Sequence, residues 1–212
     1  VTVLTDSGTG FCSLGETDIL RRSDDLLKKP TGVFVCYEFD GVRRYITSAP
    51  DYTHPAGKST IFNGDNVIYQ NDQPSVSAKM TVTVHRNVPA EYRKLEFENH
   101  TGEPAEIKVL VYAEPALAHN REIAAHPAFV KLFTRNQYDD KNGSLIFWNR
   151  NAALAVGMIT ETEFEFGTDR QLLLSTPDGI HHIPEVFDQS LDNGGWRPDS
   201  GVFLRFTLSV EP

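Results

Sequence analysis

The sequence has no long hydrophobic run and no concentration of positive charge. No stretch of about 18 consecutive apolar residues occurs, so we expect no membrane-spanning helix. The formal net charge is −9, and Lys and Arg form no patch along the chain. This balance argues against nucleic acid and anionic membranes as partners but suits neutral ligands such as sugars. No signal-peptide pattern opens the chain, and we expect a cytoplasmic location.

Cysteine is scarce, and no linker-like segment divides the chain. Cys12 and Cys36 are the two cysteines, both in apolar, strand-like surroundings. We interpret them as buried free thiols, with a disulfide as the open alternative. The longest polar stretches, 48–59 and 188–200, have the length of loops. We therefore predict one domain over residues 1–212, and we expect it to be a fragment of a longer chain.

Apolar residues recur at every second position over most of the chain, as in strands with one buried face. The runs 94–99 and 107–112 flank a Gly-containing loop, which predicts an antiparallel hairpin, and Asp40-Gly41 predicts a two-residue hairpin turn. Helical patterns are limited to 18–27, with Asp18 as candidate N-cap, and 184–190. Further strands are predicted at 32–40, 42–47, 66–71, 76–84, 130–135, 145–148, 153–159, 164–166 and 202–210. Many short strands with frequent turns predict an all-β antiparallel sandwich.

An ordered set of segments resembles the N-terminal domain of a known enzyme family. These segments are 5–13, 32–37, 48–50, 93–99, 112–114, 125–133 and 168–170. They resemble glycoside hydrolase family 94, the inverting disaccharide and oligosaccharide phosphorylases, which includes cellobiose, chitobiose and 1,2-β-oligoglucan phosphorylases and has related modules in cyclic β-1,2-glucan synthase. The resemblance spans nearly the whole chain and implies an antiparallel supersandwich of the galactose-mutarotase-like type.

The resemblance also implies a function. The family's catalytic general acid lies in a following (α/α)6 barrel, so no catalytic residue is assigned to this chain. We expect a non-catalytic, carbohydrate-associated domain that packs on the barrel, supports a homodimer and lines the edge of the sugar cleft. The implied partners are a β-glucan oligosaccharide, the chain's own barrel and a second copy. No cofactor is expected; inorganic phosphate would be a co-substrate of the parent enzyme, an inverting phosphorylase.

Five residues are candidates for contact with sugar. Trp196 lies in a polar loop, where an indole could stack on a sugar ring. His126 and Lys131 lie in the segment that matches the family most closely. Asp6 and Thr9 flank a glycine-rich turn that we interpret as a strand turn, because no Gly-Lys-Ser/Thr follows it. Other aromatic residues are weaker candidates, namely Phe11, Tyr138 and Trp148, the last of which we expect in the core.

Two alternatives remain open from the sequence. A stand-alone carbohydrate-binding module would require an exposed aromatic platform. A mutarotase-like sugar epimerase would require a His and a carboxylate to converge as general acid and base. Candidates for that pair are His119, His126, His181 and His182, with Glu114, Glu122 and Glu161. No His or Cys spacing matches a common zinc site, so we expect no metal.

Overall fold

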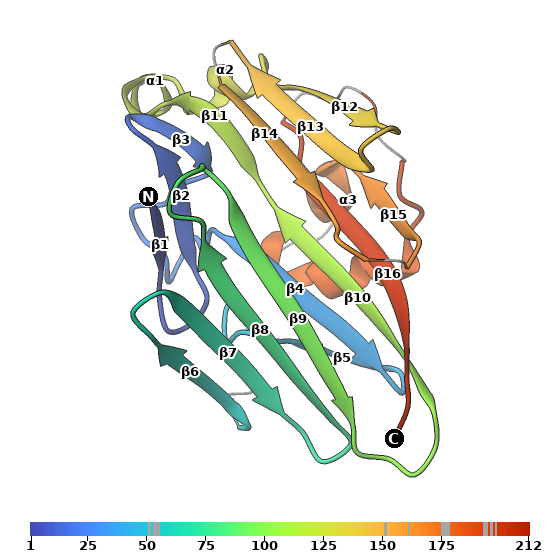
Figure 1. Ribbon diagram of the computed structural model, residues 1–212. Helices are drawn as coiled ribbons and strands as arrows, with labels where there is room; N and C mark the ends of the chain where they lie inside the picture. The colour runs from blue at the N-terminus through green and yellow to red at the C-terminus, as the bar shows by residue number, and fades with distance from the viewer. Residues whose placement is uncertain are drawn as a thin grey trace.

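The computed structural model describes the chain except for short breaks near residues 51–55, 151, 161, 175–178 and 193–198. The described residues are 1–50, 52, 56–150, 152–160, 162–174, 179–192, 195, 197 and 199–212. Antiparallel strands are the main secondary structure of the described residues, and the helices are short (Figure 1). The prediction of an all-β antiparallel sandwich is confirmed.

Within the described residues, the strands form four sheets. The first sheet has the order β1-β2-β3-β11, with β1 (Thr2–Leu4), β2 (Gly10–Leu14), β3 (Thr17–Leu20) and β11 (Pro115–His119). The second has the order β6-β7-β8-β9, with β6 (Lys58–Phe62), β7 (Asn66–Asp72), β8 (Val76–Val84) and β9 (Glu91–Asn99). The third has the order β15-β16-β10-β4-β5, with β15 (Phe164–Gly167), β16 (Val202–Val210), β10 (Ala105–Ala113), β4 (Val33–Phe39) and β5 (Val42–Tyr45). The fourth has the order β12-β13-β14, with β12 (Arg135–Asp139), β13 (Ser144–Asn149) and β14 (Ala152–Gly157).

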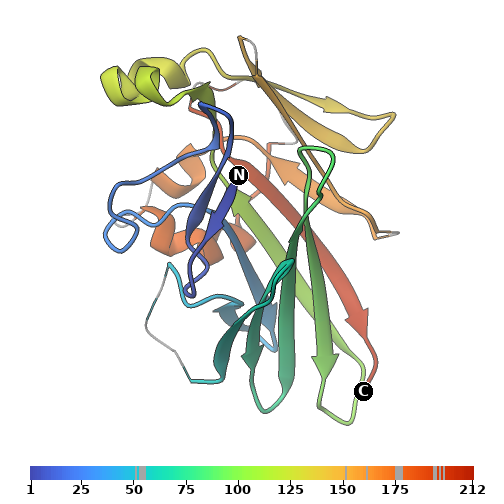
Figure 2. The same cartoon turned by 60° about the vertical axis from the view of Figure 1, so that its left-hand side comes forward.

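The main core lies between the second and third sheets. Alternate residues of β8, including Ala78 and Met80, are fully buried and pack with Tyr37 of β4 and Val109 of β10. Figures 1 and 2 show these sheets as two layers. The period-two pattern therefore arises because one face of each strand is removed from water.

Short helices cover the other face of the five-stranded sheet. The helix α3 (Gln171–Leu174) and the 3-10 helix η1 (Gly179–Asp188) contribute Leu173 and Val186 to a cluster with Phe34 and Tyr112. As a result β4 is buried on both faces, which explains its nearly continuous apolar sequence. The predicted helix over 184–190 is confirmed in part, because η1 covers residues 184–188 as a 3-10 helix.

A third apolar cluster joins the small sheet β12-β13-β14 to the rest of the domain. Phe147 of β13 packs with Leu20 of β3, Leu117 of β11 and Leu204 of β16. This end of the molecule also carries α1 (Asn120–Ala125) and α2 (Pro127–Lys131) (Figure 1). Three sheets and two helices therefore meet there, and their side chains build the site described below.

The Asp40-Gly41 turn is confirmed, since Phe39 pairs with Val42 and both turn residues have positive φ, +49° and +71°. The predicted hairpin of 94–99 with 107–112 is wrong. The strand β9 pairs with β8, whereas β10 pairs with β4 and β16, so the loop between them crosses from one layer to the other. Each strand pairs within its own layer, and each buries its apolar face in the core between the two layers.

Two other element predictions are wrong. Residues 130–135, predicted as a strand, contain the end of α2, and β12 begins only at Arg135. Pro127 occupies the first turn of that helix, where its missing N–H is harmless. The predicted helix over 18–27 does not form: residues 18–20 belong to β3, which pairs with β2 and β11 and buries Asp18 and Leu20, and residues 21–27 are irregular.

Both cysteines are free thiols; Cys36 is buried and Cys12 is half-buried. The interpretation as free thiols is confirmed, although only one of them is in the core. In the described part of the chain, no helix combines the length and apolarity needed to cross a membrane.

Candidate functional site

Glu114, between β10 and β11, is the centre of a largely buried network of charged side chains. Its Oε2 lies 2.5 Å from Nη1 of Arg21, and its Oε1 accepts a hydrogen bond from Nε of Arg170 at 2.7 Å. Tyr112 on β10 donates its hydroxyl to the same Oε1. The backbone amide of Arg21 also donates to the Glu114 carbonyl at 2.9 Å. One carboxylate thus links the end of β3 to the start of α3.

Asp199, just before β16, is the second carboxylate of the network. Its Oδ2 accepts from Nη1 of Arg170 at 2.9 Å, and its Oδ1 pairs with Nη2 of Arg21. The ammonium of Lys131, the last residue of α2, lies 3.6 Å from the same Oδ1. The network therefore ties α2 to segments that are remote from it in the sequence.

The charges in the network determine the protonation of Glu114. Burial acts to raise the pKa of Glu114, but Arg21 and Arg170 outweigh this effect and hold the pKa below its usual range. Burial and the charge of Glu114 raise the pKa of Tyr112, so its hydroxyl stays protonated and donates. Glu114 is thus an ionised hydrogen-bond acceptor at neutral pH.

Lys131 is the member of the network closest to solvent, with 33% of its side chain exposed. Burial, together with the charges of Arg21 and Arg170, lowers the pKa of Lys131 to about 8, although Glu114 acts in the opposite direction. An ammonium group held next to two guanidinium groups is electrostatically unfavourable. A lysine at position 131 therefore does not favour the stability of the fold.

The space beside Glu114 is small. A cavity of about 10 Å³ is lined by Arg21, Tyr112 and Glu114, together with residues 30–32 and Phe34. That volume holds about one water molecule, so no sugar ring can enter. Nε of Arg21 is buried and has no hydrogen-bond partner within the described ranges. We conclude that the network holds the fold together at this end of the molecule.

The outer side of α2 is apolar. Phe129 and Leu132 are 57% and 47% exposed, and Phe133 is 38% exposed. The rings of Phe129 and Phe133 meet edge to face with centroids 5.0 Å apart, and Arg150 lies over Phe133. We call Phe129, Leu132 and Phe133 the α2 patch. Lys131 points toward the network, while the patch points toward solvent.

Sequence reasoning singled out Glu114 and Lys131 but missed Arg21, Arg170 and Asp199. The five residues are separated by up to 178 positions and form no local motif. One usable signal exists, because Glu114 and Arg170 both lie in segments that carry the family resemblance, 112–114 and 168–170. Two such segments would be expected to meet in the fold.

The predicted sugar contacts fall in different places. His126 is exposed at the junction of α1 and α2, and its side chain makes no capping hydrogen bond. It lies in the same segment as Lys131. Asp6 and Thr9 belong instead to the turn between β1 and β2, which both ribbon views place away from α2. Trp196 lies outside the described residues. The sugar-binding roles of all five residues stay predictions.

The β1–β2 turn is built for packing. The hydroxyl of Thr9 is buried and lies 2.7 Å from that of Thr5, while the backbone carbonyl of Asp6 accepts from Thr60. A Cβ on Gly10 would lie 2.0 Å from the carbonyl oxygen of Val3, so only glycine fits there. The structure agrees with a strand turn and not with a phosphate loop.

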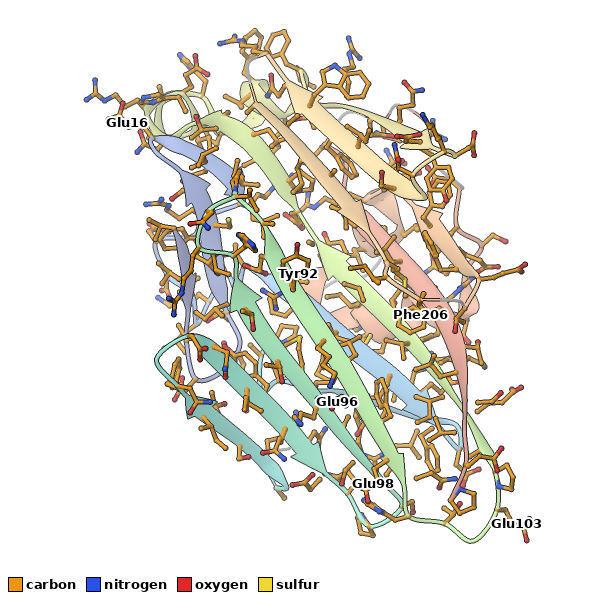
Figure 3. The ribbon with its side chains drawn as sticks, viewed as in Figure 1. Glu16, Tyr92, Glu96, Glu98, Glu103 and Phe206 are labelled. Carbon is orange, nitrogen blue, oxygen red and sulfur yellow. The ribbon has the colours of Figure 1, made fainter. Side chains whose placement is uncertain are left out.

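The described His and Glu candidates for an epimerase do not pair with one another. His119 lies 3.0 Å from Glu16, which Figure 3 labels near the α1 end of the molecule. His182 lies 2.5 Å from Glu185. Glu122 pairs with Arg150, and Glu114 has arginine partners. The side chains of His181 and Glu161 lie outside the described part. Within the described ranges, no three His, Cys, Asp or Glu residues gather as a metal site would require.

The prediction that Trp148 lies in the core is wrong. Its side chain is on the outer face of β13 and 38% exposed, whereas Leu145 and Phe147 fill the inner face. The run 145–148 has only four residues, so the alternation of apolar and polar residues does not show which face of the strand each one occupies. The indole is therefore an accessible aromatic surface.

Comparisons with known proteins agree with the architecture. The family model described as glycosyl hydrolase 94, supersandwich domain, matches residues 1–212. The chain is 24% identical over 151 residues to the cyclic beta-(1,2)-glucan synthase NdvB of Rhizobium meliloti (strain 1021). That similarity covers 70% of this chain but only 5% of the relative, so the chain spans a small part of that protein.

Proposed function

We propose a function from one premise: this chain belongs to the family of glycosyl hydrolase 94 supersandwich domains. The chain is a non-catalytic, carbohydrate-associated domain of a larger enzyme that processes a β-glucan. The name of the relative, a cyclic β-(1,2)-glucan synthase, supports this substrate class. The parent enzyme carries a helical catalytic barrel and transfers glycosyl groups, with inorganic phosphate as co-substrate if it is a phosphorylase.

The α2 patch is the observation that carries the proposed role. Phe129 lies within the five-residue helix α2, and Leu132 and Phe133 follow directly after it; all three are exposed, and such a short helix is unstable without tertiary contacts. Val130 supplies those contacts, because its side chain is buried and its carbonyl accepts a hydrogen bond from Nδ2 of Asn149 at 3.3 Å. A rigidly held apolar patch is typical of a surface that another domain covers. We place the catalytic barrel against it, with His126 and Lys131 at the margin of the sugar cleft.

The chemistry of Glu114 supports an accessory role over a catalytic one. Cleavage of a glycosidic bond by an inverting enzyme needs a protonated carboxylic acid beside the leaving oxygen. Arg21 and Arg170 instead keep Glu114 ionised and enclosed. A homodimer and a cytoplasmic location belong to the same proposal and await direct measurement.

Hydrogen exchange tests the docking role. The amides of residues 120–133 are compared between the 212-residue chain and the full-length natural protein that contains it. We expect slower exchange in the full-length protein because the barrel covers α2. The loop between β9 and β10, which Figure 1 shows at the opposite end of the molecule from α2, serves as the internal control and should not change. Equal exchange of residues 120–133 in both proteins would refute the docking role.

A further inference from the structure

The outer face of the small sheet β12-β13-β14 carries a hollow that the α2 patch does not explain. Its volume is about 540 Å³, which falls within the range of about 300–1,000 Å³ typical of small-molecule sites. The lining residues come from one strand pair and its connecting turn, namely Gln137, Tyr138, Asp139, Asp140, Lys141, Ile146 and Trp148. We call this feature the outer-sheet hollow.

The strand register places Trp148 between Arg135 of β12 and the short side chain of Ala153 on β14. Trp148 pairs with Ala153 of β14, and Ile146 pairs with Ala155. Ala153 and Ala155 are both exposed and lie on the outer face beside the aromatic residue. Because alanine side chains are short, they do not cover the indole. Trp148 is therefore an aromatic platform that is bordered on the β14 side by the short apolar side chains of Ala153 and Ala155.

Polar groups with unused hydrogen-bonding capacity surround this platform. Gln137 pairs with Ile146 in the register and is exposed. Among the described residues, no hydrogen bond or ion pair engages the side chains of Gln137, Asp140 or Lys141. Asp139 differs, since its carboxylate accepts from the Lys141 amide at 3.1 Å and from the Asn142 side chain at 2.6 Å. Asp139 shapes the turn and leaves its neighbours available to a ligand.

We propose that the outer-sheet hollow is a subsite for a neutral β-linked gluco-oligosaccharide. The apolar face of a glucose ring stacks on Trp148, and its hydroxyls bond to Gln137 and Asp140. An aromatic face next to amide and carboxylate groups matches a ligand with one apolar face and a rim of hydroxyls. The two aspartates make an anionic ligand a poorer fit. This subsite rests on the proposed carbohydrate-associated function and would hold the glucan outside the catalytic cleft.

The test titrates the folded 212-residue chain with β-1,2-linked and β-1,4-linked gluco-oligosaccharides and follows the indole N–H signals by NMR. The Trp148 signal is identified by its absence in Trp148→Ala. We expect it to shift on addition of at least one sugar series, and Trp148→Ala to weaken binding by about tenfold or more. Trp148→Phe keeps a stacking surface and should retain most of the binding, while Gln137→Ala should weaken it less than Trp148→Ala.

The matched control is Tyr92→Ala. Tyr92 is 49% exposed on β9, which belongs to the sheet β6-β7-β8-β9 and not to the small sheet (Figure 3). Its removal should leave the affinity unchanged. If the sugar binds and Trp148→Ala does not change its affinity, the subsite is overturned. That result would support a carbohydrate role elsewhere in the chain. Absence of any sugar binding, or a Trp148 signal that shifts only with protein concentration, would also overturn the subsite. The exchange experiment on α2 decides the docking role independently of these outcomes.

Discussion

Two glutamates of this domain each lie between two basic side chains, yet their surroundings differ. Glu38 on β4 accepts from Arg43 and Lys108, both at 2.7 Å, much as Glu114 accepts from Arg21 and Arg170. The exposed fraction is 12% for both glutamate side chains. The difference lies in the partners, since Lys108 is 50% exposed whereas Arg21 is only 15% exposed.

The comparison shows how the exposure of the basic partners changes the energetics of the same arrangement. For Glu38, hydrogen bonds from Lys108 and then Arg43 are the main cause of a lowered pKa. For Glu114, burial is the largest effect and raises the pKa, and Arg21 and Arg170 must overcome it. Exposed pairs contribute little because water and salt screen them, whereas a buried charge must have its partner. We infer that the Glu114 network holds the α2 end in place, while the Glu38 cluster is dispensable.

The largest effect is expected from Glu114→Gln. Loss of this charge leaves Arg21 and Arg170 with Asp199 but without Glu114, the more buried of the two carboxylates that they share, and the free energy of unfolding should fall by about 3–5 kcal/mol. Glu38→Gln should lower it by less than about 1 kcal/mol. Urea denaturation of both variants provides the measurement. Equal losses for the two substitutions would remove the distinction between the clusters.

Lowering the pH should reveal the same difference between the contributions of Glu114 and Glu38 to stability. Both carboxyl groups have lowered pKa values in the folded state, so the stability they provide is present above the unfolded pKa of about 4.3. That stability disappears as the pH falls through the folded pKa of each group. We expect Glu114→Gln to flatten the acid limb of the stability profile more than Glu38→Gln. A profile that responds more to Glu38→Gln would contradict the assignment.

A smaller gain in stability is expected from Lys131→Met. The pKa of Lys131 is about 8 in the folded protein, below an unfolded value of about 10.4. The unfolded chain therefore binds more protons between these values, and the stability of the wild-type protein rises with pH across that window. Removing the charge should stabilise the protein at pH 7 by on the order of 1 kcal/mol, after allowance for partial exposure.

Thermal unfolding of Lys131→Met at pH 7 and pH 10 tests this prediction. The stability gain should be present at pH 7 and largely absent at pH 10. A destabilised variant at pH 7 would show that the pair with Asp199 outweighs the repulsion from Arg21 and Arg170. A stabilised variant that binds sugar less well would support Lys131 as a contact residue, since functional positions often reduce stability.

The smallest expected effect is a change in these stability losses with salt concentration. At ionic strengths near 1 M the Debye length falls to about 3 Å, so exposed pairs are screened. The small loss caused by Glu38→Gln should then vanish, whereas the loss caused by Glu114→Gln should persist. Urea titrations at low and high NaCl concentration provide this comparison. Persistence of both losses would indicate that the Glu38 cluster is also shielded from solvent.

Local sequence patterns predicted strands well where one face alone is buried. The alternation over 76–84 corresponds to β8, and the Asp40-Gly41 turn was predicted correctly because two positive φ values suit these residues. The pattern failed at 18–27, where Asp18 looked like an N-cap but pairs with Arg22 and lies within a sheet. Tertiary pairing with β2 and β11 decides that segment.

The candidate site was harder to predict because its members are brought together only by the fold. Lys131 and Glu114 were named, but nothing local connects them to Arg21 or Asp199. Trp148 was assigned to the core because a single tryptophan in a short strand gives no sign of its face. The resemblance to a family helped more than the pattern did, since it drew attention to the segments that contain Glu114, Lys131 and Arg170.

The most direct measurement is the structure of the full-length natural protein that contains this chain. The account predicts that Phe129, Leu132 and Phe133 are buried against a helical catalytic barrel, with the Glu114 network intact behind them. It also predicts that the catalytic acid belongs to the barrel. An α2 patch that faces solvent in the full-length protein, or a catalytic carboxylate within this domain, would contradict the account.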